Sequence, residues 1–418
     1  MSHWYVEETS EWTLDYPPLF AWFQRLLAYP AALLDPATLY ISKLPYKSPE
    51  CVLFQRLSVV FTDAVLLSGL WLATRRRCGS QKKVTRYMVA ANAGLLIVDH
   101  IHFQYNGLLL GILLWSIALI QEGRDVAAAF LFALLLNMKH LFAALAPLYS
   151  VYLLRHYCRG PGALYKFATV GSIVAAVFAL SFGPFALMGQ MPQLLQRLFP
   201  FHRGLLHAYW APNLWALYAF MDKIMSTMVQ YLGIPFRSSP ASMTGGLVQV
   251  SHFSVLPDIG AGAAAAAVLA SMIPLLVSVW RRPDPACFAC CAALAGLNSF
   301  MLGYHVHEKA ILMSIVPLAL EAAGSLRCAR IFQRLSTIGH YSLLPLIYTQ
   351  DECILKMLMV LAYSVATCIL LEQACTEGIL EGQEKNVFDL CCGVSLGVGR
   401  ALDPDIVLLT YLLCEKAQ

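Results

Sequence analysis

The sequence predicts an all-α, polytopic integral membrane protein, and three observations carry that prediction. Of the 418 residues, 59% are hydrophobic and only 13% are charged, whereas charged residues make up about a quarter of soluble globular domains. The apolar residues form runs of helical length. These runs lack the alternating segments of about ten residues that are typical of outer-membrane barrels. Because a bilayer offers no partners for backbone polar groups, the runs are expected to be helices.

The remaining composition limits the function classes. The net charge of +4 is small, and the basic residues form short clusters between apolar runs, which indicates membrane topology rather than a nucleic-acid partner. The 13 cysteines are scattered and form no ligand-spaced cluster with histidine. The first residues are polar and aromatic rather than a cleavable signal peptide, so we expect the chain to begin in a loop.

The N-terminal part is expected to lie at the membrane surface. Residues 19–40 are amphipathic and aromatic, which predicts one or two interfacial helices broken by Pro30 and Pro36. Residues 56–71 form the first expected span. The basic cluster that follows it, beginning at Arg75, marks the cytoplasmic side by the positive-inside rule. The residues before this span then lie on the lumenal or external side.

Further spans alternate from that anchor, over residues 87–98, 107–120, 126–136, 141–154, 167–188, 255–280, 286–302 and 310–323. Residues 213–254 are ambiguous and are expected to cross an even number of times. Several runs are shorter than the roughly twenty residues that a bilayer needs, which indicates half-helices or re-entrant segments around a cavity. Three regions are expected: a first lumenal loop (1–55), a multispan domain (56–371) and an atypical tail (372–418).

This alternation assigns four polar clusters to one face of the membrane. They are Asp15, residues 99–106, residues 197–203 and residues 305–309. Because polar and charged groups at membrane depth are costly, they tend to mark functional sites. The pattern therefore predicts one shared active cavity that faces the lumen.

Asp15 is the candidate catalytic residue. It precedes Tyr16 and two prolines, which fix the backbone and remove hydrogen-bond donors. The alternative interpretation is an ordinary aspartate that begins a turn.

The other clusters are candidates for binding an anion. Asp99, His100 and His102, followed by Gln104, could bind a metal, relay protons or hold a phosphate, or could be a polar loop at a helix end. In the run His305, His307, Glu308 and Lys309 the histidines are two apart rather than the four of the zinc-protease motif. Lys309 beside histidines suits a phosphate.

Arg203 belongs to a fourth cluster that also contains Arg197, His202 and His207 among aromatic residues. Its alternative is an interfacial aromatic belt with cations that reach the headgroups.

One carboxylate with several cations fits sugar transfer from a phosphate-linked donor. The cations can stabilise the departing phosphate. One aspartate can act as the base for a single displacement with inversion, whereas glycosidases need two carboxylates. A lipid-borne donor would place such a site among membrane helices.

The sequence also resembles a known family, on motifs in the same order along the chain. They are Trp4-Tyr5, residues 9–18, residues 99–107, residues 197–201 and residues 305–309. Together they are similar to the endoplasmic-reticulum glucosyltransferases that use dolichyl-phosphate-glucose. Within that family, residues 207–213 resemble the branch that adds the second glucose to the lipid-linked oligosaccharide. The resemblance extends from about residue 4 to about residue 370.

The resemblance implies an inverting α-1,3-glucosyl transfer onto the monoglucosylated nine-mannose dolichyl-diphosphate oligosaccharide, at the lumenal side of the endoplasmic-reticulum membrane, without metal or cofactor. Asp15 matches the residue taken as catalytic in that family. In the family a membrane helix precedes the aspartate-bearing loop, whereas this chain starts inside the loop. Residues 373–418 do not resemble the family's final helices and are expected to be an alternative or mistranslated tail.

Three alternatives remain open at the level of sequence. The first is a first-glucose transferase on the same fold. The second is a membrane transporter whose polar clusters line a substrate pathway. The third is an inactive, truncated isoform.

Overall fold

The computed structural model describes residues 4–5, 14–40, 46–77, 79–199, 204–206, 211–233, 252–347, 349 and 351–380. All regular elements in these ranges are helices, which confirms the predicted all-α class. Among the described residues, five segments are long and apolar enough to cross a membrane: Pro49–Thr74, Ala163–Leu187, Ala261–Arg281, Pro285–Leu302 and Cys353–Glu377. The prediction of a multispan membrane protein is confirmed with them.

The chain divides into two compact units. The first comprises residues 1–77, 98–200 and 283–288, and the second comprises residues 78–97, 201–282 and 289–418. Each unit has its own internal contacts.

The first unit is built from helices that follow the aspartate-bearing turn. In chain order they are α1 (Pro18–Leu34), η1 (Pro36–Leu39), α2 (Pro49–Thr74), the π-helix η2 (Leu96–Ile101), α5 (Asn106–Gln121), α6 (Asp125–Met138), η3 (His140–Leu145), α7 (Ala146–His156), α8 (Ala163–Leu187), α9 (Met191–Leu198) and η5 (Pro285–Cys287). The first residues of η2 belong to the second unit.

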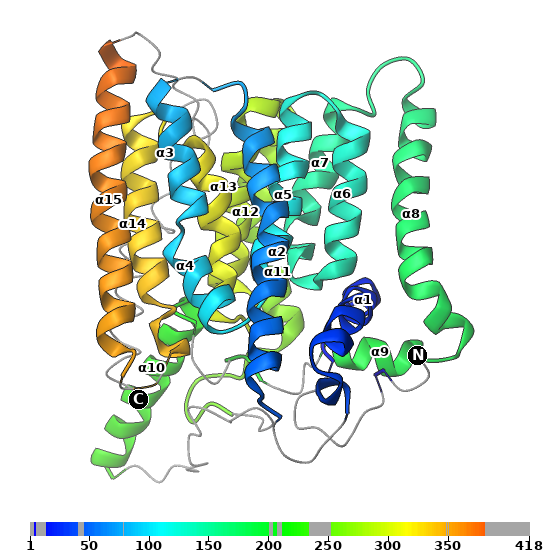
Figure 1. Cartoon of the computed structure of the whole chain (residues 1–418). Helices are drawn as coiled ribbons and strands as arrows, with labels where there is room; N and C mark the ends of the chain where they lie inside the picture. Colours follow the sequence, from blue (N-terminus) through cyan, green and yellow to red (C-terminus); the bar gives the residue numbers. More distant parts are fainter. Residues whose placement is uncertain are drawn as a thin grey trace. The chain divides into compact units, whose positions relative to one another are not determined.

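Helices α2 and α5 form the most extensive contact in the first unit and run side by side (Figure 1). Two glycines allow this approach. A Cβ on Gly111 would lie 2.6 Å from the backbone nitrogen of Leu66, and one on Gly69 would lie 2.6 Å from the carbonyl oxygen of Gly111. Trp115 Nε1 also donates a hydrogen bond to Ser68 Oγ at 3.1 Å. Small residues at such a crossing let two backbones pack directly. This contact fixes the polar groups at the N-terminal end of α5.

The second unit contains α3 (Gly79–Ala90), α4 (Ala93–Leu95), α10 (Leu214–Tyr231), α11 (Ala261–Arg281), α12 (Phe288–Leu302), η6 (Glu308–Ile311), α13 (Leu312–Ala322), α14 (Leu326–Tyr341), η7 (Leu344–Leu346) and α15 (Cys353–Leu380). Helix α14 packs on both α13 and α15, and α15 packs on α3. The hydroxyl of Tyr363 on α15 donates to the carbonyl of Met88 on α3 at 2.6 Å. These helices give the second unit its buried core.

The structure corrects the expected break at Pro30. Helix α1 continues through this proline, whereas Pro36 does begin a new element, η1. Pro30 lacks an N–H donor and therefore costs one backbone hydrogen bond. Buried side chains of α1 stand on both sides of it, at Phe20, Ala21 and Ala31, and their packing holds the helix together. The predicted span over residues 56–71 exists but is longer, since α2 begins at Pro49 and ends at Thr74.

Candidate active site

Asp15 is half-buried and stands in the short turn before α1. Pro17 is the N-cap of α1, and the next proline is the first residue of the helix. The carbonyl of Tyr16 accepts a hydrogen bond of 2.7 Å from the hydroxyl of the buried Tyr5. The ring of Tyr16 stacks on Phe20, with 4.3 Å between ring centroids. The residue that follows Asp15 is therefore held through both its backbone and its side chain.

Two basic residues at the end of α6 lie beside this turn. The ammonium of Lys139 lies 5.7 Å from the centroid of the Tyr16 ring, and it donates to Asn106 Oδ1 at 2.9 Å. Burial lowers the pKa of Lys139 to about 8, and the charge of Asp99 opposes that shift. Burial and the charge of Lys139 lower the pKa of His140 to about 4, against the charge of Asp15. The Asp15 turn thus meets one buried cation and one largely neutral imidazole.

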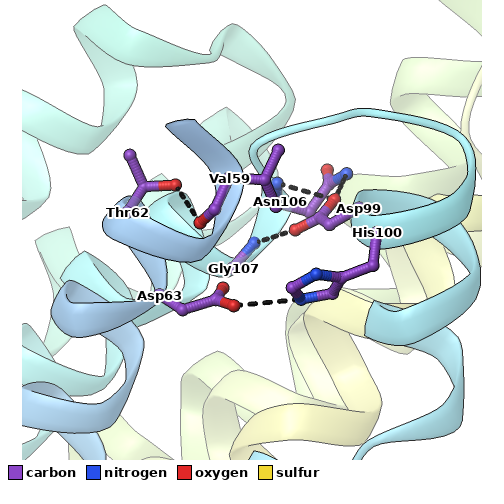
Figure 2. A network of polar contacts seen from close by, with 7 residues as sticks. All are labelled: Val59, Thr62, Asp63, Asp99, His100, Asn106 and Gly107. Carbon is purple, nitrogen blue, oxygen red and sulfur yellow. Dashed lines mark hydrogen bonds and ion pairs between the residues drawn. The ribbon is translucent and has the colours of Figure 1, made fainter. Parts of the chain in front are cut away.

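Asp99 is buried, and its carboxylate accepts three hydrogen bonds from described residues. It accepts hydrogen bonds from the backbone N–H and the side-chain amide of Asn106, at 3.0 and 2.8 Å, and a short one from the backbone N–H of Gly107 (Figure 2). These groups are the first donors of α5, which an acidic side chain satisfies well. Gln104 Oε1 accepts a further bond from the Asn106 amide at 3.1 Å. This part of the predicted cluster caps the N-terminal end of α5.

A second carboxylate, Asp63 on α2, lies next to this cap. Its Oδ2 is 2.9 Å from His100 Nε2 (Figure 2). A Cβ on Gly107 would meet Asp63 Oδ1 at 2.9 Å and Asp99 Oδ2 at 3.3 Å, so the glycine lets both carboxylates approach the backbone. The hydrogen bond that His100 donates to Asp63 raises the pKa of His100, and burial opposes the shift. The ion pair thereby favours the protonated form of His100.

The loop after η2 presents the remaining predicted residue of this cluster. His102 is exposed. Phe103, which follows it, has a φ of 56°, a conformation that is uncommon for a bulky side chain and tends to occur at functional loops. Tyr105 ties the loop to α1 and α2, because its ring stands edge-on to Phe23 at 5.3 Å and its hydroxyl lies 2.8 Å from Ser58 Oγ. The loop and the Asp15 turn therefore share α1 as a support.

The run from His305 to Lys309 belongs to the second unit. His305 also has a left-handed backbone, with φ of 53°. Its backbone N–H donates to the carbonyl of Leu205 at 2.9 Å, and its Nδ1 lies 3.0 Å from the carbonyl of Gly204. The rings of His305 and His307 are 5.9 Å apart and nearly perpendicular. The histidines are thus fixed by a neighbouring loop of the same unit.

Burial alternates along that run. His305, His307 and Lys309 are half-buried, whereas Val306 and Glu308 are buried. The carboxylate oxygens of Glu308 have no hydrogen-bond partner among the described residues, and burial raises the pKa of this group. The alternation places the three basic side chains apart from the acidic one.

The structure brings Asp15, Asp99, His100 and Gln104 into one unit, with His102 on the adjoining loop. It does not relate them to the His305 run, so the single shared cavity stays a prediction. Arg203 lies outside the described residues. Sequence reasoning did not name Asp63 or Lys139 as site residues, and it included Asn106 only as the last residue of the cluster 99–106. A carboxylate inside the apolar run 56–71 was the available signal for Asp63, since ionisable residues in spans tend to be functional.

Among the residues that the structure describes, no group of three or more His, Cys, Asp or Glu side chains could hold a metal ion. An open pocket of about 460 Å³ lies elsewhere in the first unit, at the start of α6, and its lining includes Arg124, Asp125 and Tyr157. The lining of this pocket does not include Asp15.

These features define a class: an all-helical protein with several candidate membrane spans and a buried network of charged residues next to a half-buried aspartate. The model of the ALG6, ALG8 glycosyltransferase family matches residues 1–402, and the chain belongs to that family. The match extends beyond residue 370, where the motif resemblance ends.

Three relatives show how close the similarity is. The dolichyl pyrophosphate Glc1Man9GlcNAc2 alpha-1,3-glucosyltransferase of Arabidopsis thaliana is 46% identical over 369 residues, which are 87% of this chain and 73% of the relative. The enzymes of the same name from Mus musculus and Schizosaccharomyces pombe are 44% and 42% identical, over 87% and 86% of this chain and 74% of each relative.

Proposed function

We propose that this chain transfers glucose from dolichyl-phosphate-glucose to the monoglucosylated nine-mannose dolichyl-diphosphate oligosaccharide and forms an α-1,3 linkage. It would thereby add the second glucose during assembly of the N-glycan precursor. The observation that carries the proposal is the similarity, at 41–46% identity over most of the chain, to relatives named for Glc1Man9GlcNAc2. The motif at residues 207–213 favours the same acceptor.

Asp15 is the proposed general base. It removes the proton of the acceptor hydroxyl while that oxygen attacks the anomeric carbon, and the bond from this carbon to the phosphate oxygen breaks. The products are the α-1,3-glucoside, dolichyl phosphate and the proton on Asp15. A phosphate leaves as an anion and needs no general acid, so one carboxylate suffices and the configuration inverts. The half-buried position of Asp15 in a braced turn supports this role.

The donor phosphate is proposed to bind His305, His307, Lys309 and Arg203. The first three are half-buried basic side chains on one short run, and charge-assisted hydrogen bonds from such groups suit a phosphate. His100, His102 and Gln104 are proposed to contact substrate from the loop after η2. Asp99 is proposed to support these residues rather than to touch substrate, because its carboxylate already accepts hydrogen bonds from Asn106 and Gly107. The reaction is proposed to need neither metal nor cofactor.

The proposed location is the endoplasmic-reticulum membrane, with the site facing the lumen. The positive-inside distribution supports this orientation, since Arg75, Arg76 and Arg77 follow α2 directly. The Asp15 turn comes before α2 in the chain, whereas the three arginines come after it.

The acceptor decides between this function and its neighbour. Purified protein in detergent is given dolichyl-phosphate-glucose with either the unglucosylated or the monoglucosylated acceptor. We expect product only from the monoglucosylated acceptor. Product from the unglucosylated acceptor alone would show a first-glucose transferase, and no product from either would reject the proposed enzyme.

A further inference from the structure

Lys139 is a buried cation that contacts two partners, Asn106 and the ring of Tyr16. It is 8% exposed and follows directly after α6. A buried ammonium is costly unless it is paired and hydrogen-bonded. Its described partners are the side-chain amide oxygen Oδ1 of Asn106, at 2.9 Å, and the Tyr16 ring, whose centroid lies 5.7 Å away.

The chain of contacts on one side has a fixed direction. The Asn106 amide donates to Asp99, so its carbonyl oxygen must point the other way, toward Lys139. Asp99 in turn accepts from the backbone at the start of α5. The carboxylate thus acts as the counter-charge of Lys139 through one amide. Because α5 packs closely on α2, this side of the chain is anchored in the helix pair.

The contact on the other side reaches the proposed base. Tyr16 directly follows Asp15. The carbonyl of Tyr16 accepts a hydrogen bond from Tyr5, and its ring stacks on Phe20 and lies 5.7 Å from the ammonium of Lys139. A desolvated cation over an aromatic face is a substantial attraction. Tyr16 therefore links the ammonium of Lys139 to the peptide that joins Tyr16 to Asp15.

We propose that Lys139 is a positioning residue: through the buried chain Asp99–Asn106–Lys139 and the ring of Tyr16, it holds the Asp15 turn in its reactive orientation. The effect on catalysis rests on the proposed function, whereas the effect on the turn does not. Lys139 does not itself touch the reacting atoms in this proposal.

Two test variants, Lys139→Met/Asp99→Asn and Tyr16→Leu, separate positioning from simple charge balance. Lys139→Met alone is not used, because it leaves Asp99 buried without its counter-charge and can unfold the protein. The double variant Lys139→Met/Asp99→Asn removes both charges and keeps the region neutral. Tyr16→Leu approaches from the other end and leaves both charges in place. Tyr16→Phe keeps the ring, and Lys166→Met is the matched control, because Lys166 also lies 5.7 Å from a tyrosine ring, that of Tyr157.

The first readout needs no activity. Hydrogen–deuterium exchange is followed in the peptide over residues 14–21, where the N–H groups of Phe20 and Ala21 donate to the Pro17 carbonyl. We expect exchange to accelerate about tenfold or more in the double variant and in Tyr16→Leu, and to be unchanged in Lys166→Met. Unchanged exchange in both test variants would overturn the proposal.

The second readout is the rate of glucose transfer. We expect kcat to fall about 10- to 100-fold in both test variants, because a small misplacement of a catalytic group can cost two orders of magnitude, while KM for the donor changes less than about twofold. Tyr16→Phe should lose less than Tyr16→Leu. Wild-type kcat in the double variant would show that Lys139 only balances Asp99, and would overturn the proposal. If wild-type protein transfers no glucose, the proposed function fails and the exchange readout alone decides about Lys139.

Discussion

At the scale of single residues, the first unit holds three aspartates, Asp15, Asp63 and Asp99, in different environments. Asp99 is buried and saturated with donors, whereas Asp15 is half-buried in a turn. Asp63 stands between these cases, since it pairs with the partly exposed His100. The environments therefore differ: Asp99 caps the start of α5 and Asp63 pairs with His100, while the proposed base, Asp15, stands in the turn before α1.

The Asp63–His100 pair predicts a pH-dependent stability. Because the folded state raises the pKa of His100, the pair stabilises the protein fully below the ordinary histidine pKa of about 6.5, and this stability is lost as the pH rises through the higher folded value. We expect wild-type protein to unfold a few degrees above His100→Gln at pH 6, and the difference to close by pH 9. Thermal unfolding in detergent measures it.

The control for that measurement is His252→Gln. His252 pairs with Asp258 at 2.8 Å, but both side chains are more than half exposed, so the pair should contribute little at any pH. A difference between wild type and His100→Gln that stays constant from pH 6 to 9 would contradict the assignment of a charged His100.

At the scale of elements, periodicity and apolar length predicted most helices. The expected run 107–120 is α5, and the expected run 167–188 is close to α8. The π-helix η2 was not predicted, because its hydrogen-bond pattern depends on neighbours rather than on local apolar spacing. The α2–α5 crossing was also missed, since no local pattern shows that Gly69 and Gly111 face each other.

That crossing gives a prediction for Gly111→Ala. The added Cβ would lie 2.6 Å from the Leu66 backbone, and backbone cannot yield as a flexible side chain can. We expect a loss of about 1–3 kcal/mol, typical of overpacking, together with reduced transfer, because α2 carries Asp63, the ion-pair partner of the proposed substrate contact His100. Thermal unfolding is compared with Gly171→Ala on α8, where nothing lies within 4 Å of the new Cβ. Equal behaviour of the two variants would argue against the tight crossing.

At the scale of the whole molecule, the sequence predicted the family and the function more fully than the site. Ordered motifs identify a family even when most side-chain partners are unknown. The contact of Lys139 with Asn106 forms only through the packing of α6 against α5, which local sequence does not encode. The union of Asp15 with the His305 run is a prediction about two units, and it needs a test that links them.

Donor kinetics provides such a test. We expect Lys309→Met to raise KM for dolichyl-phosphate-glucose about tenfold, because one charge-assisted contact to the phosphate is lost, while KM for the acceptor is unchanged. Lys223→Met on α10 removes an exposed cation of the same unit and should change neither constant. If Lys309→Met raised only KM for the acceptor, the run would be assigned to the wrong substrate.

The most direct test of the central claim is glucose transfer by Asp15→Asn. The amide keeps the size of the side chain and removes its basicity. With dolichyl-phosphate-glucose and the monoglucosylated acceptor, we predict a loss of kcat of about 10²- to 10⁴-fold, the range of general-base catalysis, with wild-type thermal stability and Lys166→Met as an active control. A folded Asp15→Asn protein that transfers glucose within a few-fold of the wild-type rate would contradict the assignment of Asp15 as the base.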